Sequence, residues 1–250
     1  MMSGYHSFAQ AYDALIAQQI DYSAMAKRVC QLISNYKGTR SLVLDLACGS
    51  GSLALELMRM GSDVIGVDSS PEQLMIAREK LSLNGFSPLL LCQDMTELDL
   101  YGTVEAVVCT MDSLNHLESG EQFACALSRA ALFLEPGGLL LFDLNTVYKH
   151  RCVLADHTFV YDSDPFYCVW QNEYQADQDR VQIDLDLFIH EKGTYRREQE
   201  QFAELAYPHE VVVDMLKQAG CSLLACYDGY EEQLVSDTTE RILYIARKHP

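Results

Sequence analysis

Short apolar runs alternate with amphipathic segments through the first half of the chain. Strands are predicted at Leu42–Leu46, Val64–Val67, Leu89–Cys92, Ala106–Cys109 and Leu139–Leu144, and helices between them at Ser52–Arg59, Pro71–Leu83 and Glu121–Leu134. Fully apolar strands that alternate with helices are typical of βαβ units, in which helices cover both faces of a parallel sheet. The predicted fold class is therefore α/β, with a doubly wound, mostly parallel sheet.

The pattern changes after about residue 145. Stretches such as "VQIDLDLFIH" alternate apolar and polar residues with period two, which predicts antiparallel strands with one solvated face. A helix is then predicted from Pro208 to Gly220, followed by two final strands, "CSLLACYDGY" and "RILYIARK". The predicted organisation is N-terminal helices over residues 1–40, a doubly wound domain over 41–145 and 207–250, and an antiparallel β insertion over 146–206.

Charge narrows the choice of partners. The chain has 250 residues, with 36 acids against 18 bases, for a formal net charge of −18. Nucleic-acid binding rests on Lys and Arg contacts to phosphate, so RNA, DNA and anionic membrane surfaces are not expected as partners. No apolar run reaches the roughly 18 residues of a membrane span, and the N-terminus does not have the pattern of a secretory signal.

The cysteines favour a reducing compartment. There are nine, an odd number, and most lie within apolar runs, where a free thiol behaves as a small hydrophobic group. No C-x-x-C pair is present, so we expect no metal site of the zinc-ribbon kind and place the protein in the cytoplasm.

Two glycines raise the question of a ligand. The stretch "DLACGSG" places Gly49 and Gly51 where the first strand ends, the region in which doubly wound sheets bind ligands. Glycine lets a backbone approach a ligand closely, although a tight turn required only for packing is the alternative. The letters also satisfy a dinucleotide pattern, G-x-G-x-x-A, completed by Ala54, with Asp68 ending the next strand.

Four further features favour a different class of protein from the dinucleotide-binding enzymes. Asp45 precedes Gly49 by four residues, "CQDM" places Asp94 after the third strand, "CTMDSLNHL" ends the fourth, and "LEPGGLLLFDLN" opens the fifth. Together these motifs resemble the class I S-adenosylmethionine (SAM)-dependent methyltransferases over Leu42 to Asn145, and more loosely over the final helix and strands. The nearest resemblance is to small-molecule members, the glycine and amino-sugar N-methyltransferases, and to uncharacterised bacterial homologues. "FAQAYDAL" and "DYSAMA" are similar to the helical lid of those enzymes.

The resemblance implies a seven-stranded Rossmann-like sheet with SAM as cofactor. It places Asp45 near the methionine ammonium, Asp68 on both ribose hydroxyls and Asp94 on the adenine amine. The expected cofactor contacts are Asp45, Leu46, Ala47, Cys48, Gly49, Ser50, Gly51, Asp68, Ser69, Gln93, Asp94, Met95, Thr110, Met111, Asp112, Tyr12 and Tyr22. The alternatives are that Asp68 is only a helix cap and that Asp94 is a solvated loop acid.

The expected function is methyl transfer from SAM to a nitrogen or oxygen of a small molecule. His116 is the candidate general base, because an imidazole can take a proton near neutral pH, and a purely structural His116 is the alternative. The insertion is expected to cap the substrate, with a homodimer surface as its rival. A SAM-binding regulator without turnover and a nicotinamide-dependent oxidoreductase remain as competing functions.

Overall fold

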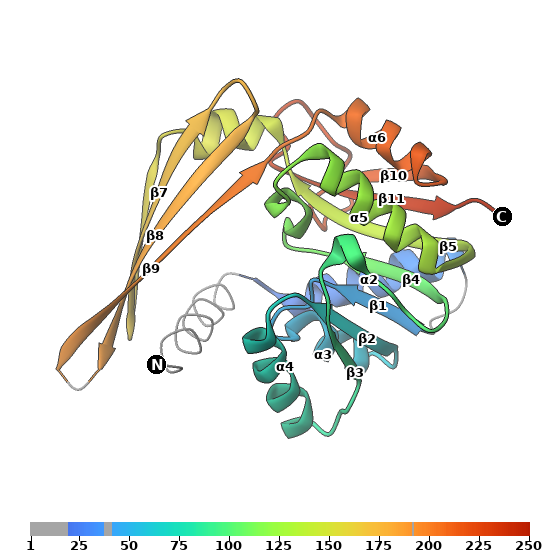
Figure 1. Cartoon of the computed structure of the whole chain (residues 1–250), viewed down its shortest axis with the longest axis horizontal. Helices are drawn as coiled ribbons and strands as arrows, with labels where there is room; N and C mark the ends of the chain where they lie inside the picture. Colours follow the sequence, from blue (N-terminus) through green and yellow to red (C-terminus); the bar gives the residue numbers. More distant parts are fainter. Residues whose placement is uncertain (1–19, 38–41, 192) are drawn as a thin grey trace.

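Seven strands form the central sheet in the computed structural model, which describes residues 20–37, 42–191 and 193–250 (Figure 1). Their order is β10-β11-β5-β4-β1-β2-β3, and all neighbours are parallel except β11, which is antiparallel to β5 and β10. The strands are β1 (Leu42–Leu46), β2 (Asp63–Asp68), β3 (Leu89–Cys92), β4 (Val104–Cys109), β5 (Leu134–Asn145), β10 (Cys221–Asp228) and β11 (Arg241–Lys248). The predicted α/β fold is confirmed.

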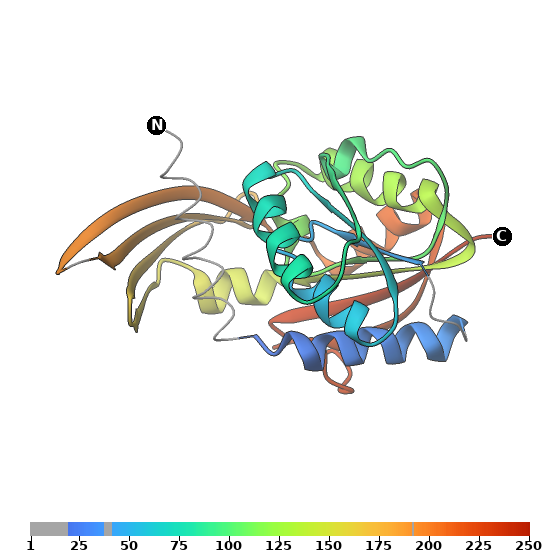
Figure 2. The same ribbon diagram turned by 90° about the horizontal axis from the view of Figure 1, so that it is seen from below.

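Helices cover both faces of this sheet (Figure 2). They are α2 (Tyr22–Lys37), α3 (Ser52–Arg59), α4 (Pro71–Leu83), α5 (Gly120–Phe133) and α6 (His209–Gln218). One apolar layer joins α2 and α3 to the sheet, and a second joins α5 and α6 to the opposite face. The predicted bounds of α3 and α4 are confirmed, and α4 begins at Pro71 after the Ser70 side chain caps it by accepting from the Gln73 N–H.

Strand β1 shows why the apolar runs are continuous. Val43 packs in the α2–α3 layer, whereas Leu44 and Leu46 pack in the α5–α6 layer. Successive side chains of a strand point to opposite faces, so a strand covered on both sides needs apolar residues at every position. Asp45 is the polar exception: it is 1 % exposed and belongs to the candidate site.

The insertion forms a separate antiparallel sheet that projects from the main body (Figure 1). Its strands run in the order β6 (Thr158–Ser163), β7 (Phe166–Gln175), β8 (Arg180–Glu191) and β9 (Thr194–Leu205). In β8, Val181, Ile183 and Leu185 are buried and alternate with less buried polar residues. The predicted antiparallel insertion with one apolar face is therefore confirmed. A π-helical segment, η3 (Lys149–Leu154), precedes it and was not predicted.

Some predicted boundaries differ from the structure or fall outside it. The predicted bounds of β2, β4 and α5 differ by one or two residues. Strand β5 begins at Leu134, not Leu139, because Leu134 pairs with Val104 before the register shifts at the Pro-Gly-Gly segment. The helix expected over residues 8–19, and with it Tyr12, lies outside the described residues. None of the helices in the described ranges is long and apolar enough to cross a membrane.

Candidate active site

A cavity of about 320 Å³ lies at the carboxyl ends of β1, β2 and β3. This position agrees with the general rule that doubly wound sheets bind ligands at that edge, next to the reversal of strand order between β1 and β4. The cavity is lined by Leu46, Ala47, Val67, Asp68, Ser69, Gln93, Asp94, Met95, Ser113, His116, Leu117, Glu118 and Gln122. Eight of the predicted site residues are in this list, including His116.

Gly49 and Gly51 are glycines for different physical reasons. Gly51 has φ +75°, and a Cβ there would lie 3.0 Å from the Cβ of Ala77 on α4, so this glycine is required by packing. Gly49 also has a left-handed backbone, φ +52°, but a Cβ built on it meets nothing within 4 Å. The space beside Gly49 is therefore open, as a site for a closely approaching ligand requires.

Asp68 holds the glycine loop and ends β2. Its Oδ2 accepts from the Gly49 N–H at 2.8 Å, and its Oδ1 accepts from the Ser70 N–H at 2.8 Å. Burial raises the pKa of Asp68, and the backbone N–H groups of Ser70, Gly49 and Ser69 oppose that rise. Ser70, not Asp68, is the N-cap of α4, so the cap alternative does not describe the position of this carboxylate.

Asp45 is a buried acid with an oxygen that lacks a partner. Its Oδ2 has no hydrogen bond within the described part of the chain. Burial, and then the negative charge of Asp68, raise the pKa of Asp45 to about 7. A buried carboxylate in this condition is costly and gains from a cationic ligand group, which is the chemistry of an ammonium.

The segment after β3 forms part of the cavity wall. Asp94 caps the short 3-10 helix η1 (Met95–Glu97), because its Oδ1 accepts from the N–H and the hydroxyl of Thr96. Gln93 is engaged elsewhere: its side chain makes two hydrogen bonds with the backbone of Asp99. Met95 leaves apolar surface on the same wall. The Gln93 amide therefore hydrogen-bonds within this loop and stabilises its shape.

A strained turn follows β4. Met111 and Asp112 both have positive φ, 60° and 51°, although neither is glycine. The fully buried carboxylate of Asp143 accepts from both of their N–H groups, at 2.9 and 2.6 Å. Arg241 then bridges the two acids, at 2.5 Å from Asp143 and 2.6 Å from Asp112. These contacts stabilise a conformation that costs on the order of 1 kcal/mol or more per residue in an L-amino acid.

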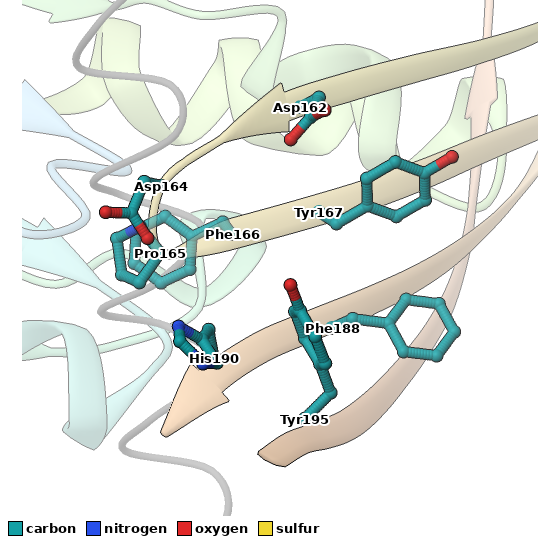
Figure 3. Close-up of a pocket in the computed structure, with 8 residues that line it drawn as sticks. All are labelled: Asp162, Asp164, Pro165, Phe166, Tyr167, Phe188, His190 and Tyr195. Carbon is teal, nitrogen blue, oxygen red and sulfur yellow. The ribbon is translucent and has the colours of Figure 1, made fainter. Parts of the chain in front are cut away.

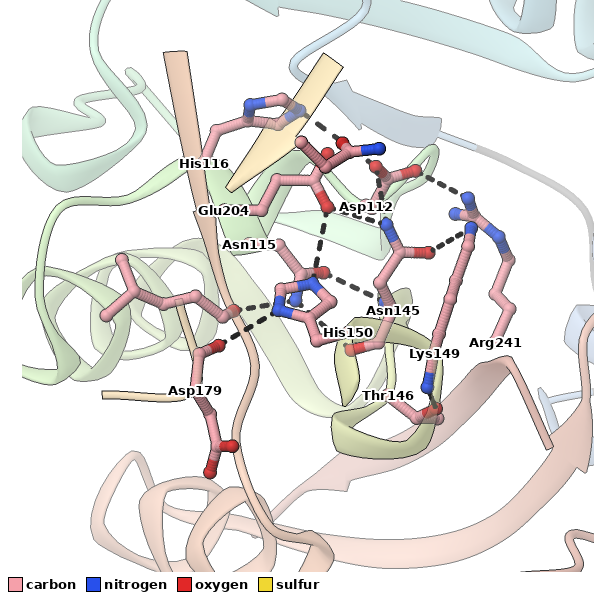
Figure 4. A network of polar contacts seen from close by, with 12 residues as sticks. Asp112, Asn115, His116, Asn145, Thr146, Lys149, His150, Asp179, Glu204 and Arg241 are labelled. Carbon is pink, nitrogen blue, oxygen red and sulfur yellow. Dashed lines mark hydrogen bonds and ion pairs between the residues drawn. The ribbon is translucent and has the colours of Figure 1, made fainter. Parts of the chain in front are cut away.

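His116 lies on the 3-10 helix η2 (Ser113–His116), beside this turn (Figure 4). Its Nε2 is 4.0 Å from Oδ2 of Asp112, and its ring packs against that of Phe202 with centroids 5.1 Å apart. Burial would raise the pKa of Asp112, but the charge of Arg241, followed by His116 and Lys149, lowers it to about 2. Asp112 is therefore a carboxylate at neutral pH and can orient His116 and stabilise its charged form.

Glu204 of β9 completes a cluster with these two residues. Asp112, His116 and Glu204 each offer an atom that could bind a metal, all within 4.8 Å of one another. The Arg241 guanidinium contacts Asp112, and the amide nitrogen of Asn145 donates to both carboxylates, at 3.0 and 2.8 Å. This charge is already compensated by protein groups, so the cluster does not favour a metal, and the absence of one stays a prediction.

The remaining predicted residues lie around the cavity, not in its wall. Ser50 receives a hydrogen bond from Lys80 at 2.8 Å, and Cys48 is buried against β2 at Gly66. Tyr22 and Met111 pack against the α2–α3 layer. The predicted residues outside the wall are Asp45, Cys48, Gly49, Ser50, Gly51, Thr110, Met111, Asp112 and Tyr22.

Sequence reasoning missed part of the wall. Ser113, Leu117, Glu118 and Gln122 line the cavity from η2 and the start of α5. Gln122 accepts from the Glu118 N–H at 2.9 Å, which holds this turn. The only available signal was their closeness in sequence to "CTMDSLNHL", since nothing in their residue types indicates a ligand.

A second cavity, of about 580 Å³, lies at the far end of the insertion (Figure 3). Tyr167, Phe188, His190 and Tyr195 line it, together with the β6–β7 turn. It shares no lining residue with the cavity beside Gly49 and Asp68, and none of the predicted site residues is in it.

Comparisons with known proteins agree with this geometry. Residues 43–138 match the protein family described as methyltransferase domain. A protein of Geobacillus sp. (strain WCH70), named as a methyltransferase, is 30% identical over 98% of this chain and 99% of its own length. An S-adenosylmethionine-dependent methyltransferase structure from Clostridium acetobutylicum ATCC 824 is also 30% identical, with a TM-score of 0.90 over 98% of this chain and 99% of that one. A Streptomyces venezuelae dTDP-3-amino-3,4,6-trideoxy-alpha-D-glucopyranose N,N-dimethyltransferase is 29% identical over 54% of this chain and 56% of its own.

Three features together define a SAM-binding α/β enzyme: the strand order with its single antiparallel strand, the glycine loop, and Asp68, the acid that ends β2. With relatives that match over its whole length, the chain belongs to the class I S-adenosylmethionine-dependent methyltransferases. SAM is therefore its cofactor. The unpartnered Asp45 oxygen and the open space at Gly49 fit a ligand with an ammonium group that lies close to this loop.

Proposed function

We propose that the protein transfers the methyl group of SAM to a nitrogen or oxygen of a small molecule, with His116 as general base. The observation that carries the proposal is the position of His116. Its side chain lines the same cavity as Asp68 and Met95, and Asp112 lies 4.0 Å from its Nε2. A base at the wall of the cofactor cavity is where an acceptor must release its proton.

In the proposed step, the acceptor atom forms a bond to the methyl carbon while the carbon–sulfur bond breaks, and S-adenosylhomocysteine leaves. SAM supplies the reactive sulfonium, and the protein supplies position and a route for the proton. His116 takes the acceptor proton, and the Asp112 carboxylate stabilises the resulting imidazolium. Arg241 keeps Asp112 ionised for this role.

The cofactor roles of the individual residues are part of the proposal. Asp68 accepts from the ribose hydroxyls, Asp94 and Met95 face adenine, and Asp45 pairs with the methionine ammonium. Support comes from the places of Asp68, Asp94 and Met95 in the cavity wall and from the free oxygen of Asp45.

We infer that residues 146–206 and residues 1–40 enclose the acceptor, while residues 41–145 and 207–250 hold SAM. Support comes from β9, whose Phe202 packs on His116 and whose Leu205 carbonyl accepts from Asn115 at 2.7 Å. The rival role of the insertion is a homodimer surface, since β6 and β9 are sheet edges.

The net charge of −18 supports a small-molecule acceptor and argues against nucleic acid or an anionic membrane surface as partner. The free cysteines support a cytoplasmic location. The resemblance to an aminosugar N,N-dimethyltransferase makes amino sugars the first acceptors to test.

The test is a methyl-transfer assay with labelled SAM over a panel of amino sugars, small amines, amino acids and phenols. Turnover of at least one acceptor, reduced at least a hundredfold in His116→Gln with SAM affinity unchanged, supports the proposal. Binding of SAM without turnover of any acceptor favours a regulatory protein. Binding of NAD comparable to that of SAM in a calorimetric titration contradicts the proposal.

A further inference from the structure

Two buried ionisable side chains meet where the insertion joins the main domain. His150, on η3, is fully buried, and Glu204, near the end of β9, is 2 % exposed. Neither lines the cofactor cavity. Burying ionisable groups costs free energy unless they are paired, so both side chains need a partner at this junction.

The hydrogen-bond geometry determines one of the protons on His150. Its Nδ1 lies 2.9 Å from the backbone carbonyl oxygen of Asp179. A carbonyl oxygen can only accept, so Nδ1 must carry the hydrogen. The remaining ring nitrogen, Nε2, has no hydrogen-bond partner among the described residues, and Oε2 of Glu204 is 3.4 Å from it.

The contact between His150 and Glu204 therefore joins η3 to β9 inside the protein. Because both side chains are buried, this 3.4 Å contact fixes the position of one relative to the other.

The pair is joined to the candidate base through Asn145 (Figure 4). The amide nitrogen of Asn145 donates to Oε2 of Glu204 at 2.8 Å and to Oδ2 of Asp112 at 3.0 Å. Lys149 donates to the Asn145 carbonyl oxygen at 2.9 Å, which sets the orientation of the amide. Asp112 in turn faces His116.

The charged groups around the pair are engaged with other partners. Arg241 contacts Asp112 and Asp143, and the Asp179 carboxylate contacts Arg151. Lys149 feels the charges of Asp112, Glu204 and Glu240 but donates to Asn145. Among the described residues, the ionic partner of Glu204 is His150, whose Nε2 lies 3.4 Å from Oε2 of Glu204.

We propose that His150 and Glu204 are positioning residues that, through Asn145, hold Asp112 against His116. The insertion thus contributes to the geometry of the catalytic groups as well as covering the acceptor. The link to catalysis rests on the proposed role of His116, whereas the contact between His150 and Glu204 does not.

Glu204→Gln and His150→Gln test the contact between the two side chains. In each variant the new amide can hydrogen-bond to a neighbouring group, which favours folding. Glu173→Gln, at an exposed position of the same insertion, is the matched control. The unfolding equilibrium constant of each protein is measured by urea denaturation at pH 7.

We expect both pair variants to lose more stability than Glu173→Gln does, because replacing one member leaves the other buried without its partner. Stabilities equal to that of Glu173→Gln would overturn the proposal. Should one pair variant not fold, the other gives the same comparison.

The positioning role needs a kinetic measurement with an acceptor from the panel. We expect Glu204→Gln to lower kcat at least tenfold while the affinity for SAM stays within twofold, and Glu173→Gln to change neither. An unchanged kcat would refute the positioning role. Reduced stability of the pair variants in a protein that methylates no acceptor would instead refute the proposed function alone.

Discussion

The backbone N–H of Gly49 donates to the carboxylate of Asp68 at 2.8 Å, which joins the loop after β1 to the end of β2. The two residues are 19 positions apart, and parallel pairing of β1 with β2 brings them together. One oxygen of Asp68 thus shapes the loop that is proposed to hold the cofactor, while the carboxylate also forms part of the cavity wall.

Replacing Asp68 by Ala is expected to weaken SAM binding tenfold or more. Hydrogen bonds to a charged group contribute about 1.5–3 kcal/mol each, and the variant also frees the Gly49 loop. Calorimetric titration with SAM measures the loss, and circular dichroism checks the fold. Asp63→Ala, at the exposed start of β2, is the control and should bind normally. Equal affinities in the two folded variants would contradict a ribose role for Asp68.

Alanine at the two glycines should separate packing from ligand approach. Gly51→Ala forces a Cβ to within 3.0 Å of Ala77 and adds left-handed strain, so it should lower the unfolding free energy by more than Gly49→Ala does. Gly49→Ala should lower the unfolding free energy by about 1–2 kcal/mol, which is the cost of a left-handed backbone. It should also weaken SAM binding, because its Cβ enters the open space.

Gly61→Ala measures the free-energy cost of a left-handed alanine by itself. Gly61 has φ +86° with nothing within 4 Å of a Cβ, and it lies after α3, away from the cavity wall. Thermal melts and SAM titrations on all three variants make the comparison. If Gly49→Ala binds SAM as well as Gly61→Ala does, the cofactor does not approach Gly49.

SAM affinity should rise with pH between 6 and 8. The pKa of Asp45 is raised to about 7 in the free protein, so the carboxylate is largely protonated at pH 6 and can pair with an ammonium only after it ionises. Titrations at pH 6, 7 and 8 measure the effect. Asp45→Asn should bind SAM more weakly, and its SAM affinity should depend less on pH. If the SAM affinity of the wild type depends on pH just as little, Asp45 does not pair with the ammonium.

The same group has the opposite effect on the free protein. Because its folded pKa lies above the unfolded value of about 3.9, Asp45 binds protons more strongly in the folded state. Its contribution to stability is fully present below about pH 4 and is lost as the pH rises through 7. Wild type should therefore lose more stability than Asp45→Asn between pH 6 and 8 in urea denaturation.

Deleting residues 147–204 tests the role of the insertion. One amide nitrogen, Nδ2 of Asn115, donates to the carbonyls of both Asn145 and Leu205, so a short Gly-Ser linker can join the ends. We expect SAM binding to persist and methyl transfer to disappear, in a monomer, because the acceptor side is then open. Activity that survives while a dimer becomes a monomer would identify the insertion as a dimer surface instead.

The sequence by itself determined the helices and strands and the position of the glycine loop. Apolar runs at Leu42–Leu46 and Leu89–Cys92, and the helices between them, were predictable because strand and helix periodicity are local properties. Gly49, Gly51 and Asp68 were predictable because the chemistry of the loop needs these residue types at this spacing. The sequence could not separate the packing role of Gly51 from the open space at Gly49, which depends on where α4 lies.

Tertiary structure alone decided the surroundings of His116, on the proposed acceptor side. Asp112 meets Arg241 across 129 positions, and Asp143 holds a left-handed turn that its own segment does not predict. Neither Glu204 nor His150 stood out in the sequence, and the two side chains meet only because β9 returns beside η3 and buries both of them. Charge pairing in a buried site depends on which groups the fold brings together, and local sequence carries no record of that.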